Sequence, residues 1–223
     1  IKTVLEAVRD AMREELRRDE RVFVMGEDVG ARGGVFLATE GFLEEFGDLR
    51  VIDTPLAEAS IAAIALGAAV HGMRPIAEIE FADFIWPSIN QLIGEAARAR
   101  YGSRGAPSVP MVVRAPYGGG IRGGLYHSQS VEAYFAHTPG LKVVTPATPY
   151  DAKGLLKSAI RDPNPVIFLE SELLYGRSFE VPPGDDLLVP IGKARVAREG
   201  TDVTIVSFGI GVSRIEAAVE QLE

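Results

Sequence analysis

Short apolar runs alternate with longer helix-like segments along most of this chain, and this alternation limits the folds open to it. The expected strands are 22–25, 51–52, 75–81, 109–114, 141–144 and 166–169. The expected helices are one opening after Thr3, then 39–46, 59–70, 88–101 and 149–160. Strands alternating with helices favour an α/β protein with a mainly parallel, doubly wound sheet.

Local signals place several helix ends. Thr3 and Glu6 have the spacing of a capping box, and Pro149 suits the first position of a helix. A glycine at position 47 is expected to stop the helix at 39–46. The segment 59–70 is almost wholly small or apolar, which predicts a helix buried on all sides.

The last fifth of the chain differs in composition. Residues 179–186 are acidic and rich in Pro and Gly, which is typical of linkers. We expect an α/β domain over residues 1–178, and a linker with a connecting strand over 179–200. Residues 201–223 are expected to begin a second α/β domain, with a strand at Val203–Ser207 and a helix opening at Ser213.

Composition excludes several classes of function. The net charge of −8 over 223 residues argues against a nucleic-acid-binding surface. The chain has no cysteine, which excludes disulfides, thiolate metal sites and a cysteine nucleophile. No secretory or transmembrane segment is evident, so no membrane partner is expected and the cytoplasm is the expected location.

Glycine clusters suggest two kinds of phosphate-binding loop. Gly118 to Gly123 fits the dinucleotide pattern G-x-G-x-x-G after a strand, but that motif requires a helix to open on its third glycine. Residues 125–128 intervene here, so a dinucleotide cofactor is disfavoured. A P-loop is excluded because no Walker lysine follows a glycine loop.

Two side chains are candidates for catalysis. Glu58 falls in the first turn of the apolar helix, where the helix dipole alone favours a carboxylate. Its apolar neighbours would favour a carboxyl that shares a proton near neutral pH, so both a structural and a functional role stay open. His127 follows a strand and a glycine-rich loop, where α/β sheets form crevices, although a lone histidine is more often structural. His71 and His137 have weaker cases.

Six stretches, in the same order, resemble the E1 β subunits of the pyruvate and branched-chain 2-oxo acid dehydrogenase complexes. They are GEDVG at 26–30, DTPLAE at 53–58, EIEFADF at 78–84, YHSQS at 126–130, PGLKVV at 139–144 and DAKGLL at 151–156. The resemblance covers essentially the whole chain and implies a thiamine-diphosphate-binding domain of the pyrimidine type. It also implies that this chain carries only the beginning of the family's C-terminal domain.

The resemblance assigns roles to particular residues. Glu58 matches the glutamate that hydrogen-bonds N1′ of the aminopyrimidine, which helps the 4′-nitrogen to take the proton from thiazolium C2. Leu56 and Phe84 match positions that pack on the pyrimidine. Glu80 stands where branched-chain enzymes often carry Gln, and Phe84 where they often carry Tyr, which puts the side-chain hydrogen bonds in doubt. His127 matches a histidine that handles protons at the substrate end of the site.

The family also has a structural potassium site built from backbone carbonyls. By position it falls at Met111, Ala159, Ile160, Asp162 and Asn164. The prolines in 162–165 could fix a loop whose carbonyls converge, and a simple turn after a helix explains the same residues equally well.

The resemblance further implies an E1 α partner in an α2β2 heterotetramer, with the α subunit holding the diphosphate through Mg²⁺. The reaction is oxidative decarboxylation of a 2-oxo acid, branched-chain favoured over pyruvate, with acyl transfer to lipoyl-E2. A eukaryotic member would lie in the mitochondrial matrix. Two alternatives stay open, an enzyme of the transketolase or deoxyxylulose-phosphate-synthase type and a noncatalytic assembly subunit. The first would need an upstream Gly-Asp-Gly signature, which this sequence lacks.

Overall fold

The computed structural model describes residues 1–182, 184 and 186–222, and its main feature is a parallel sheet of six strands. The strand order is β3-β2-β4-β5-β7-β6, and every neighbouring pair is parallel. The strands are β2 (Val22–Gly26), β3 (Val51–Asp53), β4 (Arg74–Glu78), β5 (Val112–Tyr117), β6 (Lys142–Val144) and β7 (Val166–Ser171). The predicted doubly wound α/β fold is confirmed.

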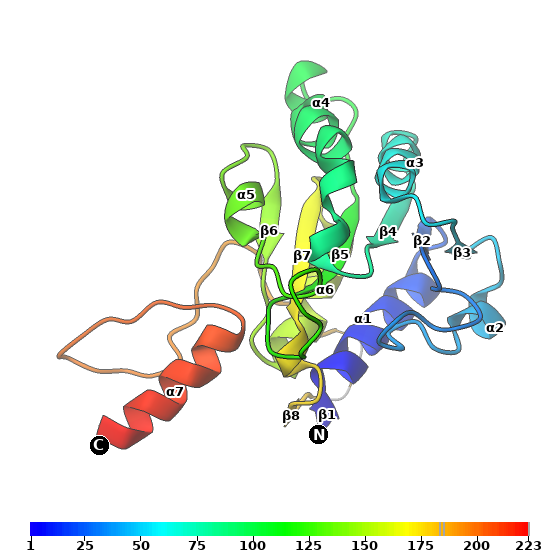
Figure 1. The fold of residues 1–223 in the computed structure, drawn as a ribbon. Coiled ribbons are helices and arrows are strands. Elements are labelled where there is room, and N and C mark those ends of the chain that lie inside the picture. Colours follow the sequence, from blue (N-terminus) through cyan, green and yellow to red (C-terminus); the bar gives the residue numbers. More distant parts are fainter. Residues whose placement is uncertain (183, 185, 223) are drawn as a thin grey trace.

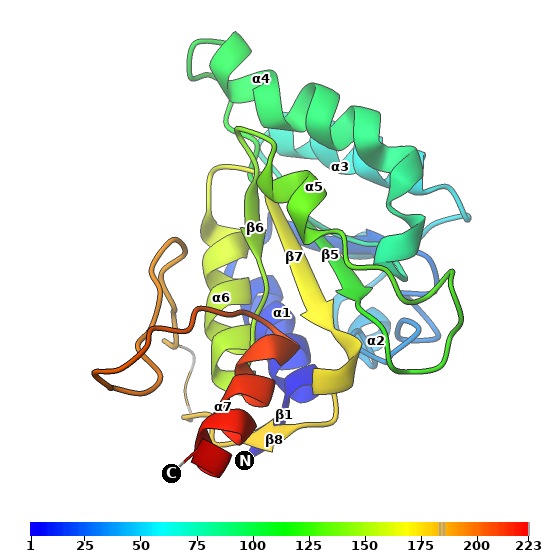
Figure 2. The same cartoon turned by 60° about the vertical axis from the view of Figure 1, so that its left-hand side comes forward.

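Helices cover both faces of this sheet (Figures 1 and 2). Helices α1 (Val4–Arg18) and α6 (Pro149–Arg161) pack together on one face, with α2 (Phe42–Phe46) beside them. The opposite face carries α3 (Glu58–Val70), α4 (Ala97–Gly102) and α5 (Glu132–Ala136). Because each face is covered, β2, β5 and β7 are buried at every position, and most of their side chains are apolar.

Several helix ends are as predicted. Thr3 caps α1 through a complete capping box with Glu6, and Pro149 opens α6 behind the capping residue Thr148. The helix expected at 88–101 is present in three parts. These are the 3-10 turn η2 (Trp86–Ser88), the π-helical segment η3 (Asn90–Ala96) and α4.

The details of several predicted elements were wrong. The helix expected at 39–46 is only Phe42–Phe46, because Gly41 adopts φ 77° and the Thr39 hydroxyl bonds Val29 O instead of capping a helix. Strand β5 begins at Val112, because the Val109 and Met111 amides bond Pro163 O and Val109 O rather than a neighbouring strand. Helix α3 is not buried on all sides, since one face packs on the sheet while Ile64 is 57% exposed.

Near the end of the chain, the predicted strand is absent and the predicted helix begins at another residue. Val203–Ser207 forms no strand and is exposed, because no described strand lies beside it to complete a hydrogen-bonded ladder. Helix α7 (Ile210–Leu222) begins before Ser213, whose hydroxyl bonds Ile210 O within the first turn. The expected linker includes positions 183 and 185, and the last expected domain includes 223, which lie outside the described residues. The division into domains stays a prediction.

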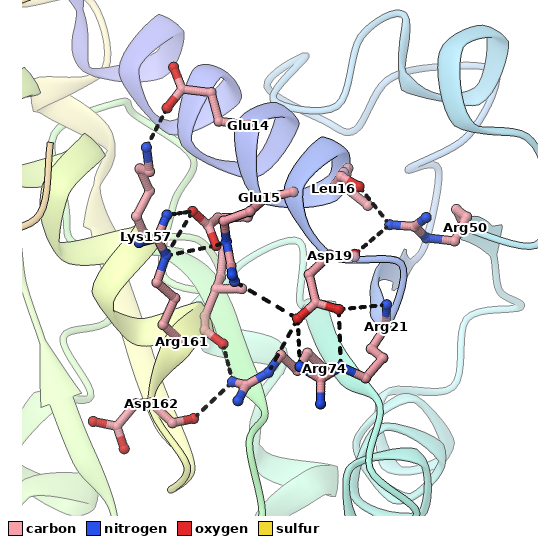
Figure 3. Close-up of polar contacts among 12 residues, drawn as sticks. Glu14, Glu15, Leu16, Asp19, Arg21, Arg50, Arg74, Lys157, Arg161 and Asp162 are labelled. Atoms are coloured by element: carbon pink, nitrogen blue, oxygen red, sulfur yellow. Dashed lines mark hydrogen bonds and ion pairs between the residues drawn. The ribbon is translucent and has the colours of Figure 1, made fainter. Parts of the chain in front are cut away.

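A network of ion pairs ties α1 to α6 at the amino-terminal side of the sheet (Figure 3). Glu15 is completely buried and binds Arg161 at 2.6 Å and Arg18 at 2.7 Å. Glu14 binds Lys157 at 2.6 Å. The hydrogen bond from Arg21 keeps the pKa of Asp19 well below its usual range. A buried carboxylate needs such partners. Because the partners of Glu14 and Glu15 lie on α6, the network links the two helices.

A second sheet contains two short strands that the sequence periodicity did not predict. Strand β1 (Lys2–Thr3) pairs antiparallel with β8 (Ser178–Phe179), which brings the start of the chain beside the segment that follows β7. Among the described residues, no helix is long and apolar enough to cross a membrane.

Candidate active site

The candidate site lies at the carboxyl ends of the strands, where the strand order changes direction. The chain places β3 on one side of β2 and β4 on the other. Ligands of open α/β sheets bind in the crevice at such a point. Glu27 directly follows β2, Glu80 and Phe84 follow β4, and His127 lies in the loop after β5. Glu58 opens α3, which follows β3.

Three glutamates from different strand ends interact here. Burial raises the pKa of Glu27 to about 7, assisted by the charges of Glu80, Glu58 and Asp28. A hydrogen bond from the backbone amide of Ala57 opposes this rise only in part. Burial and the Asp28 charge also raise the pKa of Glu80, while the nearby Arg32 lowers it. A carboxyl that titrates near neutral pH is suited to moving protons.

The structure therefore brings the predicted residues Glu58 and Glu80 together and adds Glu27 to them. Sequence reasoning did not single out Glu27. Its position in the sequence could have indicated it, because Glu27 directly follows a buried strand and stands next to Asp28. Its perturbation depends on charges supplied by two other strand ends, which no local pattern reveals.

Glu58 is fixed through its backbone. The Ser88 hydroxyl, in η2, donates to the Glu58 carbonyl at 2.7 Å, and Ser88 is completely buried. The residue before Glu58, Ala57, has no side-chain cap to offer the helix. The first turn of α3 is thus held from outside the helix, and the partly buried Glu58 side chain lies at its amino end.

His127 packs edge-on against two aromatic rings. Its ring centroid lies 4.5 Å from that of Phe81 and 5.4 Å from that of Phe84. Gly123 lies beneath it, where an added Cβ would come within 2.6 Å of the His127 Cβ. The positive charge that His127 can carry lowers the pKa of Glu80, so the two side chains are electrostatic neighbours.

Several buried polar atoms without hydrogen-bond partners lie at the carboxyl ends of the strands. Glu27 Oε1, Thr54 Oγ1 and His127 Nδ1 are buried and have no hydrogen-bond partner among the described residues. Native proteins rarely leave such atoms unpaired unless a ligand or water satisfies them. Leu56, from the loop before α3, is 78% exposed and thus available to a ligand, whereas Phe84 is partly buried. These unpaired polar atoms, together with the apolar side chains beside them, fit a polar aromatic ring such as an aminopyrimidine.

The dinucleotide alternative finds no support in the loop after β5. Helix α5 begins only at Glu132, so no helix opens on Gly123. A cavity of about 780 Å³ lies elsewhere, at the amino ends of β6 and β7, with Arg100, Gly140 and Asn164 among its lining residues. Parallel sheets bind ligands at the opposite end, so we place the site at the carboxyl ends.

The five residues of the expected potassium site lie near one another, at the amino ends of β5 and β7 and the end of α6. Arg74 donates to Ile160 O at 2.7 Å and to Asp162 O at 3.4 Å. Met111 O accepts from Val166 N, and Ala159 O accepts from Asp162 N. Asn164 bonds the Asp162 carboxylate. A guanidinium thus already faces two of the five carbonyls.

No group of three or more His, Cys, Asp or Glu in the described part of the chain could hold a metal ion.

Comparison with known proteins identifies the family. Residues 2–177 match the family model described as "Transketolase, pyrimidine binding domain". The chain is 57% identical to the 2-oxoisovalerate dehydrogenase subunit beta of Bacillus subtilis, over all of this chain and 68% of that protein. It is 53% identical to the pyruvate dehydrogenase E1 component subunit beta of Rhizobium meliloti, over 99% of this chain and 48% of that protein.

A solved structure shares the fold. The protein described as "Split gene transketolase, inactive beta4 tetramer" superposes with a TM-score of 0.78 at 21% identity, over 99% of this chain and 67% of that one. The chain therefore belongs to the β-subunit family of the 2-oxo acid dehydrogenases, and residues 2–177 are its transketolase-type pyrimidine-binding domain.

Proposed function

We propose that this chain is the β half of a thiamine-diphosphate-dependent 2-oxo acid dehydrogenase, active only with an α subunit. It would take part in oxidative decarboxylation of a 2-oxo acid. The observation that carries this proposal is the group of three interacting glutamates beside unpaired buried polar atoms at the switch point of the sheet. The similarity to two kinds of E1 β subunit agrees with it.

Glu58 is proposed to hydrogen-bond N1′ of the aminopyrimidine, with Leu56 and Phe84 against the ring. Thiamine diphosphate, when bound, supplies a nucleophilic carbon and an electron sink for decarboxylation. Glu58 would hold a proton at N1′, and Glu27 and Glu80 would keep the local charge balanced as that proton moves. Glu27 suits this role because its pKa, raised by burial and by Glu80 and Glu58, is about 7.

His127 is proposed to face the substrate and to handle charge and protons there. Its ring is oriented by Phe81 and Phe84, and its Nδ1 is free to bond a ligand. An imidazole changes its protonation close to neutral pH, which suits a group that donates and accepts protons within one reaction cycle.

The identity of the substrate and the partners follows the relatives. A branched-chain 2-oxo acid is favoured over pyruvate, in line with the 2-oxoisovalerate dehydrogenase relative. The α subunit of an α2β2 heterotetramer would hold the diphosphate through Mg²⁺, and the acyl group would pass to the lipoyl domain of E2. A cytoplasmic location, or the mitochondrial matrix in a eukaryote, completes the proposal.

Potassium binding at the five carbonyls stays a prediction, and Arg74 competes for two of them. If the ion binds, the melting temperature of the assembled enzyme should be higher in potassium chloride than in choline chloride at equal ionic strength. Equal melting temperatures would show that Arg74 alone satisfies this loop.

The variant Glu58→Ala tests the catalytic proposal. With the α partner present, decarboxylation of 2-oxoisovalerate should fall by about 10²-fold or more, the range of acid–base groups. Glu44→Ala is the control, because Glu44 also lies in the first turn of a helix, α2, at a distance from this edge. Unchanged decarboxylation by Glu58→Ala would overturn the assignment, and a strong preference for pyruvate would overturn the substrate choice.

A further inference from the structure

The loop that carries His127 is anchored by a single buried carboxylate from another element. Asp83 lies in the 3-10 turn η1 (Ala82–Phe84) after β4 and is 7% exposed. Its Oδ1 accepts from the Ser128 amide at 3.3 Å and its Oδ2 from the Gln129 amide at 3.2 Å. Each oxygen therefore binds one of the two residues that directly follow His127.

The rest of this loop has mostly internal bonds. Residues 119–126 are exposed, and the Ser128 hydroxyl and the His127 amide both bond Gly124 O, at 2.6 Å and 3.4 Å. Gly118 N bonds Gln129 O at 2.9 Å, which closes the loop on itself. Such bonds preserve the shape of the loop but do not place it over the sheet. The aromatic contacts of His127 and the two hydrogen bonds to Asp83 tie it to the segment after β4.

A second buried carboxyl lies beside Asp83. Glu172 opens the turn η4 (Glu172–Leu174) after β7, is 6% exposed, and its Oε2 has no hydrogen-bond partner among the described residues. The end of β7 pairs with the end of β5, where the loop begins. An added Cβ on Gly120, within the loop, would touch Leu173 at 2.8 Å, so η4 and the loop are in contact.

We propose that Asp83 positions His127 by anchoring residues 128 and 129, and that the charge of Glu172 controls how firmly this anchor holds. The proposal rests on the catalytic role proposed for His127. Asp83 touches neither substrate nor cofactor in this scheme and acts only through the loop. Glu172 would act one step further away, through Asp83.

Burial and a neighbouring charge make ionisation of Glu172 harder than it is in water. Burial and the Asp83 carboxylate raise the pKa of Glu172 to about 7. Glu170, in the preceding strand β7, is bound on both oxygens by Arg114. His127, across the loop, packs on Phe81 and Phe84. Above about pH 7, ionised Glu172 would place a second buried negative charge beside Asp83, and the loop should loosen.

Hydrogen exchange of the peptide 118–131 tests the proposal in the full β subunit assembled with its α partner. Rates would be measured on either side of about pH 7 and corrected for intrinsic exchange. Asp83→Asn should speed exchange about ten-fold, because an amide group retains one acceptor but turns a donor toward the second backbone N–H. Glu172→Gln should abolish the difference between the two pH values.

Asp19→Asn is the matched control, since Asp19 also accepts a backbone amide, from Arg21 at 3.0 Å, but lies at the opposite edge of the sheet. It should leave the exchange of 118–131 unchanged. Asp83→Asn should also lower kcat for 2-oxoisovalerate about ten-fold with little change in KM, since misplacement of a catalytic group affects the reacting state. Wild-type exchange in Asp83→Asn, or an unchanged pH difference in Glu172→Gln, would overturn the proposal. Exchange needs no turnover, so these outcomes are separate from failure of the proposed function, which Glu58→Ala reports.

Discussion

Glu27 and Glu58 approach closely enough, at the start of helix α3, for their carboxyl groups to repel each other. Burial raises the pKa of Glu27 first, and the charges of Glu80 and then Glu58 raise it further, to about 7. The Ala57 amide, one residue before Glu58, opposes this rise in the pKa of Glu27. Two carboxyls from different strand ends therefore share one electrostatic environment, and changing one should alter the titration of the other.

The variant Glu58→Gln should lower the pKa of Glu27 from about 7. The substitution removes one of the negative charges that oppose ionisation of Glu27 and leaves its burial unchanged. Carbon-13 NMR of labelled glutamate side chains, titrated in the β subunit, measures this directly. Glu44→Gln serves as the control at a distant helix start. A Glu27 pKa that does not move in Glu58→Gln would mean that the two groups do not interact.

Glu27 should also make the stability of the protein depend on pH. Its folded pKa of about 7 exceeds its ordinary value of 4.5, so the folded state binds the proton more tightly than the unfolded state. Its effect on the free energy of unfolding is therefore absent below about pH 4.5 and becomes more destabilising as the pH rises to about 7. Urea denaturation across this window should show a smaller decline in stability for Glu27→Gln than for the wild type. Identical slopes would contradict the assignment.

The order of strands and helices was predictable because a parallel sheet covered on both faces turns its strands into continuous apolar runs. Val22–Gly26 and Val166–Ser171 are buried throughout and were found with small errors at their ends. Strands β1 and β8 are two residues each and exist only because they pair with each other, so no local pattern indicates them. Val203–Ser207 shows the converse, an apolar run without a strand beside it.

The candidate site was predictable only in part, for a related reason. Glu58 and His127 stand in stretches that resemble a known family, and the structure places them at one edge. Glu27 and Asp83 were missed because their importance comes from contacts across the sheet. The acidity of Glu27 depends on Glu80 and Glu58, and Asp83 matters through amides of the loop after β5. Such pairings depend on strand order, which sequence periodicity does not provide.

Arg114 should be required for folding stability. It is 1% exposed, donates to both oxygens of Glu170 at 2.5 and 2.7 Å, and also binds Glu78. Arg114→Met would leave two buried carboxyls without their cation, which costs about 3–5 kcal/mol. Burial raises the pKa of Glu78, so the loss of stability should grow as rising pH ionises that carboxyl without its cation. The free energy of unfolding from urea denaturation measures it.

The control for this variant is Arg17→Met. Arg17 pairs with Glu45 at 2.5 Å, but its side chain is 62% exposed, so the loss should stay below about 1 kcal/mol. Equal losses for Arg114→Met and Arg17→Met would show that the buried group contributes no more than a surface ion pair.

Ser88 should support catalysis through the backbone of Glu58. Its buried hydroxyl donates to Glu58 O at 2.7 Å, and Ser88→Ala removes this second bond to a carbonyl within the first turn of α3, at a cost of about 0.5–1.5 kcal/mol. Because the first turn of α3 loses its outside support, kcat with the α partner should fall while the substrate KM changes little. Ser103→Ala is the matched control, since its exposed hydroxyl also bonds a carbonyl, that of Arg100 at 3.2 Å. If the Ser88 and Ser103 variants lose the same stability and activity, the first turn of α3 does not depend on Ser88.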